Sequence, residues 1–140
     1  MGSLDDLKIL DFSTLLPGPY ATLMLADMGA EVLKISSASR PDIVLDYPPF
    51  IGDTGVSASQ AWLGRNKKTM FLNLKTGEGK AVVKELVKEY DIVLEQFRPG
   101  VMEKLGLGYE DLKAVNPKLI YCSLTGYGPV SYTHLTLPTT

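Results

Sequence analysis

The chain opens with a strand–helix–strand pattern, and this pattern limits its possible folds more than any other feature. The apolar run LKILDF, residues 7–12, predicts a strand, and the segment YATLMLADM that follows Pro17 and Pro19 predicts a helix. Proline suits the first turn of a helix, because the backbone donors there have no intrahelical partners. Gly29 can end this helix in a left-handed conformation, and EVLKI, residues 31–35, predicts a second strand. Such a β-α-β unit predicts two parallel strands joined by a right-handed crossover.

Three further apolar runs continue the alternation of strands and helices. They lie at residues 69–74, 91–95 and 118–126, and helical patterns separate them. One of these helices is expected at residues 77–90, with Thr76 as its N-cap. Its apolar side would consist of Val82, Val83, Leu86, Val87 and Tyr90. Five strand runs with helical connections predict an α/β fold whose sheet is Rossmann-like, doubly wound and mostly parallel.

Two segments depart from this regular alternation. The helix after Pro19 is apolar on nearly every side, so we expect it to be buried. Residues 36–59 are rich in Ser, Pro, Gly and Asp and have no sustained period. Long loops of this kind are often lids or binding loops, so this segment is predicted to be an excursion loop whose role stays open.

Charge and cysteine content exclude several classes of function. The formal net charge of −2 offers no basic surface to a nucleic acid. The longest apolar stretch is interrupted by Asp27 and is too short to span a bilayer, and the first ten residues lack the pattern of a signal peptide. The single cysteine, Cys122, lies in an apolar run and is expected to be a buried strand thiol. One cysteine cannot form an internal disulfide, which favours a reducing compartment and a cytoplasmic location.

The residues just after each strand are the candidates for a binding site, because open α/β sheets bind ligands beyond the carboxyl ends of their strands. The first such turn, STLLPGP, contains only Gly18 and lacks the G-x-G-x-x-G pattern, so an NAD-dependent oxidoreductase is not expected. The sequence contains neither a P-loop nor a G-x-S-x-G motif. His134 is its only histidine, which excludes a multi-histidine metal site.

Two later turns carry groups that could hold a ligand. Arg98 directly follows a strand and could pair with a phosphate or a carboxylate, or could form a salt bridge at a helix end. Gly126 and Gly128 flank Tyr127, so a ligand could approach the backbone closely there, or the segment could be an ordinary turn. The residues alone therefore predict a ligand at the strand ends, favour an anion, and leave the reaction open.

Three segments resemble the N-terminal part of the class III CoA-transferases. They are LKILDFSTLLPGPYATLMLADMGAEVLKI, RNKKTMFLNLKTGEG and DIVLEQFRPGVMEKLGLGYEDLKAVNPKLIYCSLTGYG. The pattern E-x-F-R-P-G-V-x-x-x-L-G-L-G-Y in the third is long and specific, and the resemblance covers residues 6–129. This CaiB/BaiF type of family also includes the α-methylacyl-CoA racemases. The resemblance implies a Rossmann-like large domain without a glycine fingerprint and, for full-length chains, a homodimer of two interlocked rings.

The resemblance also implies what the chain would bind. Coenzyme A or an acyl-CoA would be one substrate and a carboxylic acid the other, with no tightly bound cofactor and no metal. The residues expected to contact coenzyme A are Leu72, Asn73, Leu74 and Lys75 at the adenine and ribose, Gln96, Phe97 and Arg98 along the site, Lys104 near the phosphates, and Thr125, Gly126, Tyr127 and Gly128 beside the pantetheine arm. Two positions depart from the family. Ser37 stands where many members have a phosphate-binding arginine, the nearest here being Arg40, and Leu16 stands where the formyl-CoA type has a glutamine.

The chain ends in GYGPVSYTHLTLPTT, residues 126–140, and departs from the resemblance within this segment. The family places its catalytic group about ten residues beyond this turn, as an aspartate in transferases or a histidine–aspartate pair in racemases. From Val130 onward the sequence matches neither, and His134 comes too early and lacks an adjacent aspartate. We therefore expect a partial large domain at residues 1–129, an artefactual non-family tail at residues 130–140, and no catalytic residue.

The sequence thus predicts an N-terminal fragment of a class III CoA-transferase that is inactive alone and cannot interlock into a dimer. Two alternatives stay open. One is a fragment of an α-methylacyl-CoA racemase, and the other is a non-catalytic module that binds coenzyme A.

Overall fold

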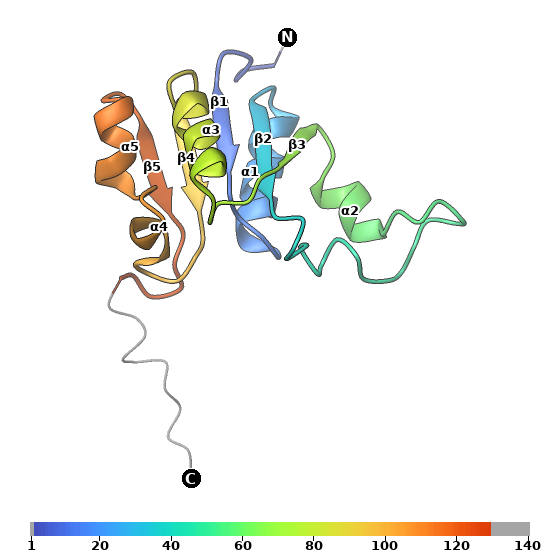
Figure 1. Cartoon of the computed structure of the whole chain (residues 1–140). Helices are drawn as coiled ribbons and strands as arrows, with labels where there is room; N and C mark the ends of the chain where they lie inside the picture. Colours follow the sequence, from blue (N-terminus) through green and yellow to red (C-terminus); the bar gives the residue numbers. More distant parts are fainter. Residues whose placement is uncertain (1, 130–140) are drawn as a thin grey trace.

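A computed structural model describes residues 2–129 and contains a five-stranded sheet in which all neighbouring strands are parallel (Figure 1). The strands are β1 Lys8–Asp11, β2 Glu31–Ser36, β3 Lys67–Phe71, β4 Ile92–Glu95 and β5 Ile120–Ser123. Their order across the sheet is β3-β2-β1-β4-β5, so the chain adds strands on one side of β1 and then on the other. This topology confirms the predicted Rossmann-like, doubly wound α/β class.

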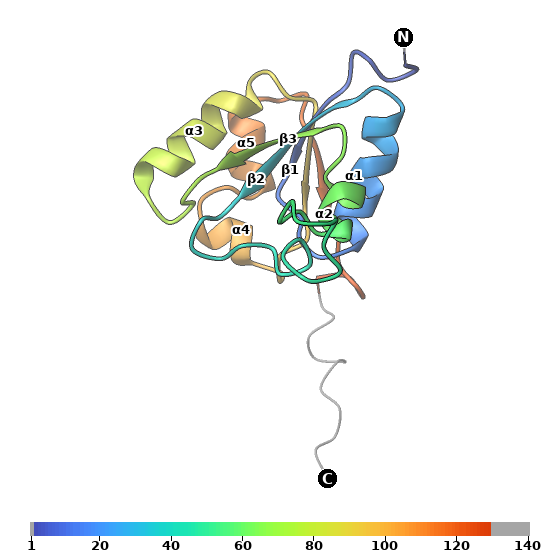
Figure 2. The same cartoon turned by 90° about the vertical axis from the view of Figure 1, so that its right-hand side faces the viewer.

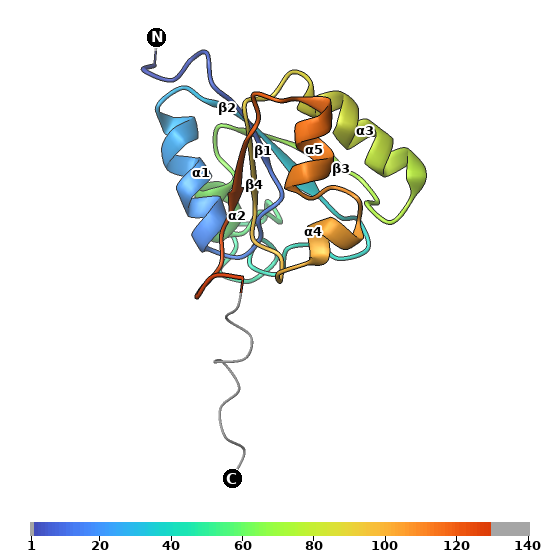
Figure 3. The same cartoon turned by 90° about the vertical axis from the view of Figure 1, so that its left-hand side faces the viewer.

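Helices cover both faces of the sheet, as a doubly wound fold requires. Helices α1 Pro17–Asp27 and α2 Ala58–Leu63 lie on one face (Figure 2). On the other face lie α3 Gly77–Val87, α4 Val101–Lys104 and α5 Tyr109–Val115 (Figure 3). None of the helices within residues 2–129 combines the length and the apolar character needed to cross a membrane.

The predicted local signals account for most helix ends. Helix α1 begins at Pro17, and Gly29 follows it with a φ of 108°, in the left-handed region that glycine tolerates. Helix α3 is capped by Thr76, whose hydroxyl accepts a hydrogen bond of 3.1 Å from the Gly79 amide. The segment between β2 and α2 contains neither a helix nor a strand, which confirms the predicted excursion loop.

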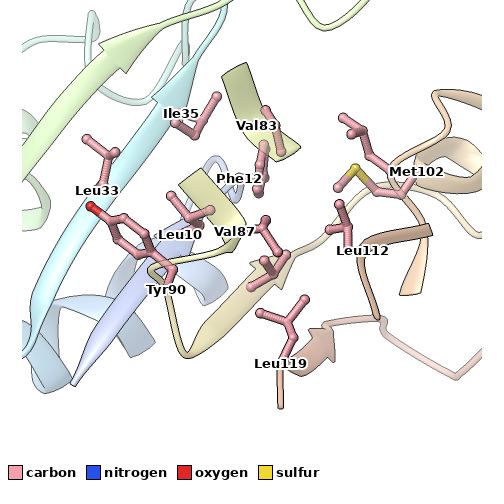
Figure 4. Packing of buried hydrophobic residues seen from close by; sticks show 12 residues of the cluster. Leu10, Phe12, Leu33, Ile35, Val83, Val87, Tyr90, Met102, Leu112 and Leu119 are labelled. Atoms are coloured by element: carbon pink, nitrogen blue, oxygen red, sulfur yellow. The ribbon is translucent and has the colours of Figure 1, made fainter. Parts of the chain in front are cut away.

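The main hydrophobic core lies between the sheet and helices α3, α4 and α5 (Figure 4). Its buried members are Leu10, Phe12, Leu33, Ile35, Val83, Val87, Tyr90, Val93, Met102, Leu107, Leu112 and Leu119. A smaller cluster of Ile9, Ala26, Ala30 and Val32 lies under α1. Alternate strand residues feed the two clusters, because successive side chains of a strand point to opposite faces.

Several sequence expectations about burial or boundaries are wrong. Val82 was assigned to the apolar side of α3 and is 37% exposed, because the buried stripe of that helix runs through Val83 and Val87. Cys122 is exposed rather than buried, because it lies on the edge strand β5, where Ile120 on the same face is also 60% exposed. Strand β3 begins two residues earlier than residue 69, because its pairing with β2 starts at Lys67.

Helix α1 is only half buried, which corrects the expectation that it is enclosed. Its inner side, including Thr22, Leu23 and Ala26, packs on the sheet. Its outer side carries a stripe of apolar side chains that are between 43% and 50% exposed. They are Leu16, Tyr20, Met24 and Met28. The predicted tail at residues 130–140, with His134, lies outside the described residues.

Candidate functional site

The carboxyl ends of all five strands lie at one edge of the sheet, and helix α4 lies beside them (Figure 1). Strands β1 and β4 are neighbours, but the chain leaves them toward opposite faces, through α1 and α4. This reversal is the switch point at which open α/β sheets form a crevice for ligands. The segments that follow β1 and β4 are therefore central to any site at this edge.

Gln96 ties these two segments together across the switch point. Its side-chain oxygen Oε1 accepts a hydrogen bond of 3.0 Å from the Gly18 amide, and its Nε2 donates one of 2.7 Å to the Thr14 carbonyl. A Cβ atom on Gly18 would overlap Ser13 and the Gln96 side chain. Glycine is therefore required at this turn by close packing inside the loop. Gln96 is predicted to line a coenzyme A site, but its side-chain amide is engaged in positioning the loop after β1.

The first turn of α1 does not provide a phosphate site. Pro17 and Pro19 have no backbone donor, and Gln96 occupies the amide of Gly18. The Tyr20 amide donates to the Leu16 carbonyl within the helix. Of the described residues in this turn, none keeps an amide for a pyrophosphate, which a dinucleotide site would place here. This geometry agrees with the prediction against an NAD-dependent enzyme.

Two carboxylates lie next to the switch point, and both are buried and engaged. The Glu95 carboxylate accepts hydrogen bonds from the Ser123 hydroxyl at 2.6 Å and from the Phe97 amide at 2.8 Å. The Asp11 carboxylate accepts from the Ser13 amide at 2.8 Å and also from the hydroxyls of Ser13 and Thr22. These carboxylates are thus engaged in hydrogen bonds that hold the strand ends and the turns after them.

The structure brings the residues predicted to contact coenzyme A to this one edge, but spreads them along it. Residues 72–75 follow β3, residues 96–98 follow β4, Lys104 ends α4, and residues 125–128 follow β5. Strands β3 and β5 are the two outer strands. Four interstrand spacings separate them, which is about 19 Å. Only an elongated ligand could meet all of these segments.

The predicted contact residues differ in what they can offer a ligand. The side chains of Leu72, Leu74 and Phe97 pack against the main core and are partly buried, so they offer a ligand only part of their apolar surface. Asn73, Lys75, Arg98, Lys104 and Gly126 are exposed, and so is Tyr127, at 73%. The exposed cations are thus spaced along the edge.

The turn after β5 is closed by its own hydrogen bond. The Gly128 amide donates to the Thr125 hydroxyl at 2.9 Å, and Gly128 has a φ of 84°. A Cβ atom on Gly126 would meet open space. The turn is thus preformed and leaves the Tyr127 ring exposed, a geometry that fits both interpretations of this segment.

A buried network of charges on the α1 side of the sheet was missed by sequence reasoning. The Lys34 ammonium lies 3.1 Å from the Asp42 carboxylate, and the Lys67 ammonium donates to the Pro19 carbonyl at 2.7 Å and lies 3.9 Å from Asp11. A cavity of about 340 Å³ adjoins Lys34 and Lys67 beneath α2, and none of the predicted coenzyme A contacts lines it. The signal in the sequence was a lysine at an inward position of each of two strands.

Burial lowers the pKa of Lys67 to about 8, with the nearby Lys34 charge adding to the effect and Asp11 opposing it. The unfolded chain keeps this proton up to the ordinary lysine pKa of 10.5. Between pH 8 and 10 the unfolded state therefore binds more protons, and the free energy of unfolding should rise with pH. We expect a rise on the order of 1 kcal/mol per pH unit near pH 9 in denaturant titrations.

Two lysine-to-arginine variants test this pH dependence. Lys67→Arg keeps the cation but removes its titration, so the rise between pH 8 and 10 should flatten. Lys68→Arg changes the exposed neighbour, whose side chain is 73% accessible, and should keep the rise. An unchanged slope in Lys67→Arg would show that the buried ammonium does not titrate in this range.

No metal centre is found within residues 2–129, where no three His, Cys, Asp or Glu side chains are grouped so that they could hold an ion.

Comparisons with known proteins agree on one family. The family model for CoA-transferase family III matches residues 4–134. The succinyl-CoA:mesaconate CoA-transferase of Haloarcula marismortui is 44% identical over an alignment of 133 residues, which covers 91% of this chain and 33% of that protein. The human succinyl-CoA:glutarate CoA-transferase is 41% identical over 126 residues, covering 89% of this chain and 28% of that protein.

Solved structures give the same result. A CAIB/BAIF family protein from Brucella suis superposes with a TM-score of 0.82 at 40% identity, over 89% of this chain and 34% of its own. The chain spans about a third of the length of the curated relatives it matches.

Proposed function

This chain belongs to CoA-transferase family III, and from that premise we propose that it supplies part of a site that transfers coenzyme A between carboxylic acids. The observation that carries the proposal is the carboxyl edge of the sheet, where Lys75, Arg98 and Lys104 are exposed over a long span. Coenzyme A is elongated and carries phosphates that such cations bind. The usual phosphate position at the first helix is closed by its prolines, which directs a ligand along the strand ends instead.

The twelve predicted contacts remain the proposed coenzyme A site, with a division of roles. The exposed cations and the Tyr127 ring would contact the ligand directly. The backbone of residues 72–75 and the turn at residues 125–128 would flank its two ends. Gln96 would act by holding the loop after β1 rather than by touching the ligand.

We propose that the chain by itself does not complete the transfer. In such a reaction a carboxylate attacks the thioester carbonyl and the coenzyme A thiolate leaves, which makes an anhydride that the thiolate can attack in turn. Asp11 and Glu95 are the carboxylates next to the switch point, and both are buried in hydrogen bonds. The group that performs the attack is therefore proposed to lie elsewhere. Interlocking concerns full-length chains, and we propose none for this chain.

The relatives quoted above are both named as CoA-transferases, which favours transfer over the racemase alternative. A module that only binds coenzyme A would share the edge and its cations. Residues 2–129 therefore do not distinguish a transferase from a module that only binds coenzyme A, and the preference for transfer rests on the names of the full-length relatives.

Calorimetric titrations with coenzyme A and with NADH test the proposed function. We expect coenzyme A to bind and NADH to give no heat of binding, because the first turn of α1 lacks free amides for a pyrophosphate. Binding of NADH with no response to coenzyme A would contradict the proposal. An acyl-transfer assay on the same sample should be blank, and turnover would show that a residue of this chain performs the attack.

A further inference from the structure

The Asp42 carboxylate joins three segments of the chain that are separate in sequence. Its side chain is 3% exposed and lies 3.1 Å from the ammonium of Lys34 in β2. Its two oxygens accept hydrogen bonds from the Leu15 amide, at 3.2 and 3.1 Å, and one also accepts from the Val44 amide at 3.2 Å. The excursion loop, strand β2 and the loop after β1 are thus fastened at one buried charge.

The contact with Leu15 holds an unusual backbone. Leu15 has a φ of 63°, in the left-handed region that leucine rarely adopts, so other interactions must hold it there. The Asp42 carboxylate binds the amide of this residue, and Gln96 binds Thr14 and Gly18 on either side of it. Two buried or half-buried side chains from neighbouring segments therefore fix the loop at three backbone groups.

The fixed loop lies at the switch point and carries two exposed apolar side chains, one of which, Leu16, belongs to the outer stripe of α1. Leu15 is 42% exposed and Leu16 is 50% exposed, while the charged pair beneath them is hidden from solvent. A leucine released from the Asp42 contact would relax toward negative φ and move both side chains. The conformation of this exposed loop thus depends on a carboxylate that is itself buried.

We propose that Asp42, held by Lys34, is a positioning residue that keeps the loop after β1 in the shape that receives an acyl-CoA. The inference rests on the proposed function and adds a residue that acts on the site through Leu15. It also gives the excursion loop a role, since that loop carries Asp42. A substrate that contacts the excursion loop or the loop after β1 would then change the conformation of the other loop as well.

Asp42→Asn tests the proposal, with Asp46→Asn as its matched control. The asparagine has the same shape but loses the charge that pairs with Lys34, whereas Asp46 is exposed in the same loop. If the receptive loop falls to a tenth of the population, the Kd for coenzyme A rises about tenfold. The Leu15 amide should also move in the NMR spectrum and lose protection from exchange. Asp46→Asn should change neither measurement.

A folded Asp42→Asn variant that binds coenzyme A within twofold of the unmodified chain would overturn the positioning role. If that variant does not fold, the test is made on the unmodified chain. Adding coenzyme A should then shift the NMR signal of the Leu15 amide and increase its protection from exchange. Binding that leaves this amide unchanged would overturn the proposal. Failure of the unmodified chain to bind coenzyme A would overturn the proposed function and, with it, the role of Asp42. Normal binding by both the unmodified chain and Asp42→Asn would overturn only the role of Asp42.

Discussion

Replacing Val83 by aspartate is expected to unfold the chain, whereas the same replacement at Val82 should leave it folded. Val83 is fully buried in the main core (Figure 4). Val82, its neighbour in α3, is 37% exposed. A carboxylate at residue 83 would lose its hydration among apolar side chains and find no cation there. That cost is several kcal/mol, a large part of the roughly 5–15 kcal/mol that stabilises a small domain.

Thermal unfolding followed by circular dichroism measures both variants. Val83→Asp should show no cooperative transition, or one lowered by more than about 15 °C. Val82→Asp should lose only about 1 kcal/mol or less, through repulsion from the nearby Glu78 and Glu85, because valine and aspartate have similar helix propensities. Equal melting of the two variants would mean that α3 does not pack on the sheet through Val83.

The sequence predicted the elements well because their signals are local. Apolar runs of four to six residues, prolines at the start of α1, Gly29 after it and the Thr76 cap each act within a few residues. The parallel topology followed from the alternation of strands and helices. The resemblance to class III CoA-transferases, carried by long motifs, supplied the family that the comparisons confirm.

Burial was harder to predict where it depends on which strand lies at the edge. Cys122 belongs to an apolar run that reads as an inner strand, but β5 is an outer strand and one of its faces is open. The apolar character of α1 likewise does not reveal which side meets the sheet. Local sequence gives the hydrophobicity of a residue, and the position of its element in the sheet decides whether that residue is covered.

The roles within the candidate site were hardest to predict, because they depend on distant partners. Gln96 binds Gly18, 78 residues away in sequence, and Asp42 binds Leu15, 27 residues away. Neither pair has a spacing or a motif that indicates contact. Lys34 appears in the sequence as an ordinary charged residue of a strand, Lys67 lies just before the predicted third strand, and only the fold shows that both side chains are buried. The direct contacts with coenzyme A remain predictions.

Replacing Arg98 by alanine is expected to weaken coenzyme A binding by about 10- to 100-fold. An arginine–phosphate pair is a charge-assisted, two-pronged hydrogen bond, and such bonds contribute about 1.5–3 kcal/mol. Arg98 lies three residues after the end of β4, near the switch point, and its carbonyl accepts the Val101 amide at 3.1 Å, a backbone contact that alanine keeps. Calorimetry with coenzyme A gives the Kd, and circular dichroism checks that the fold is unchanged.

Two further variants decide what a loss of affinity at Arg98 means. Lys118→Ala removes an exposed cation from the opposite edge of the sheet, just before β5, and should leave the Kd unchanged. Arg98→Lys keeps the charge but not the planar fork, so an intermediate loss would indicate a two-pronged contact with phosphate. Equal losses of affinity in Arg98→Ala and Lys118→Ala would mean that only the net charge of the chain matters for binding. A Kd of Arg98→Ala within twofold of that of the unmodified chain would show that the guanidinium does not contact coenzyme A. The remaining cations, Lys75 and Lys104, would then have to account for any binding at this edge.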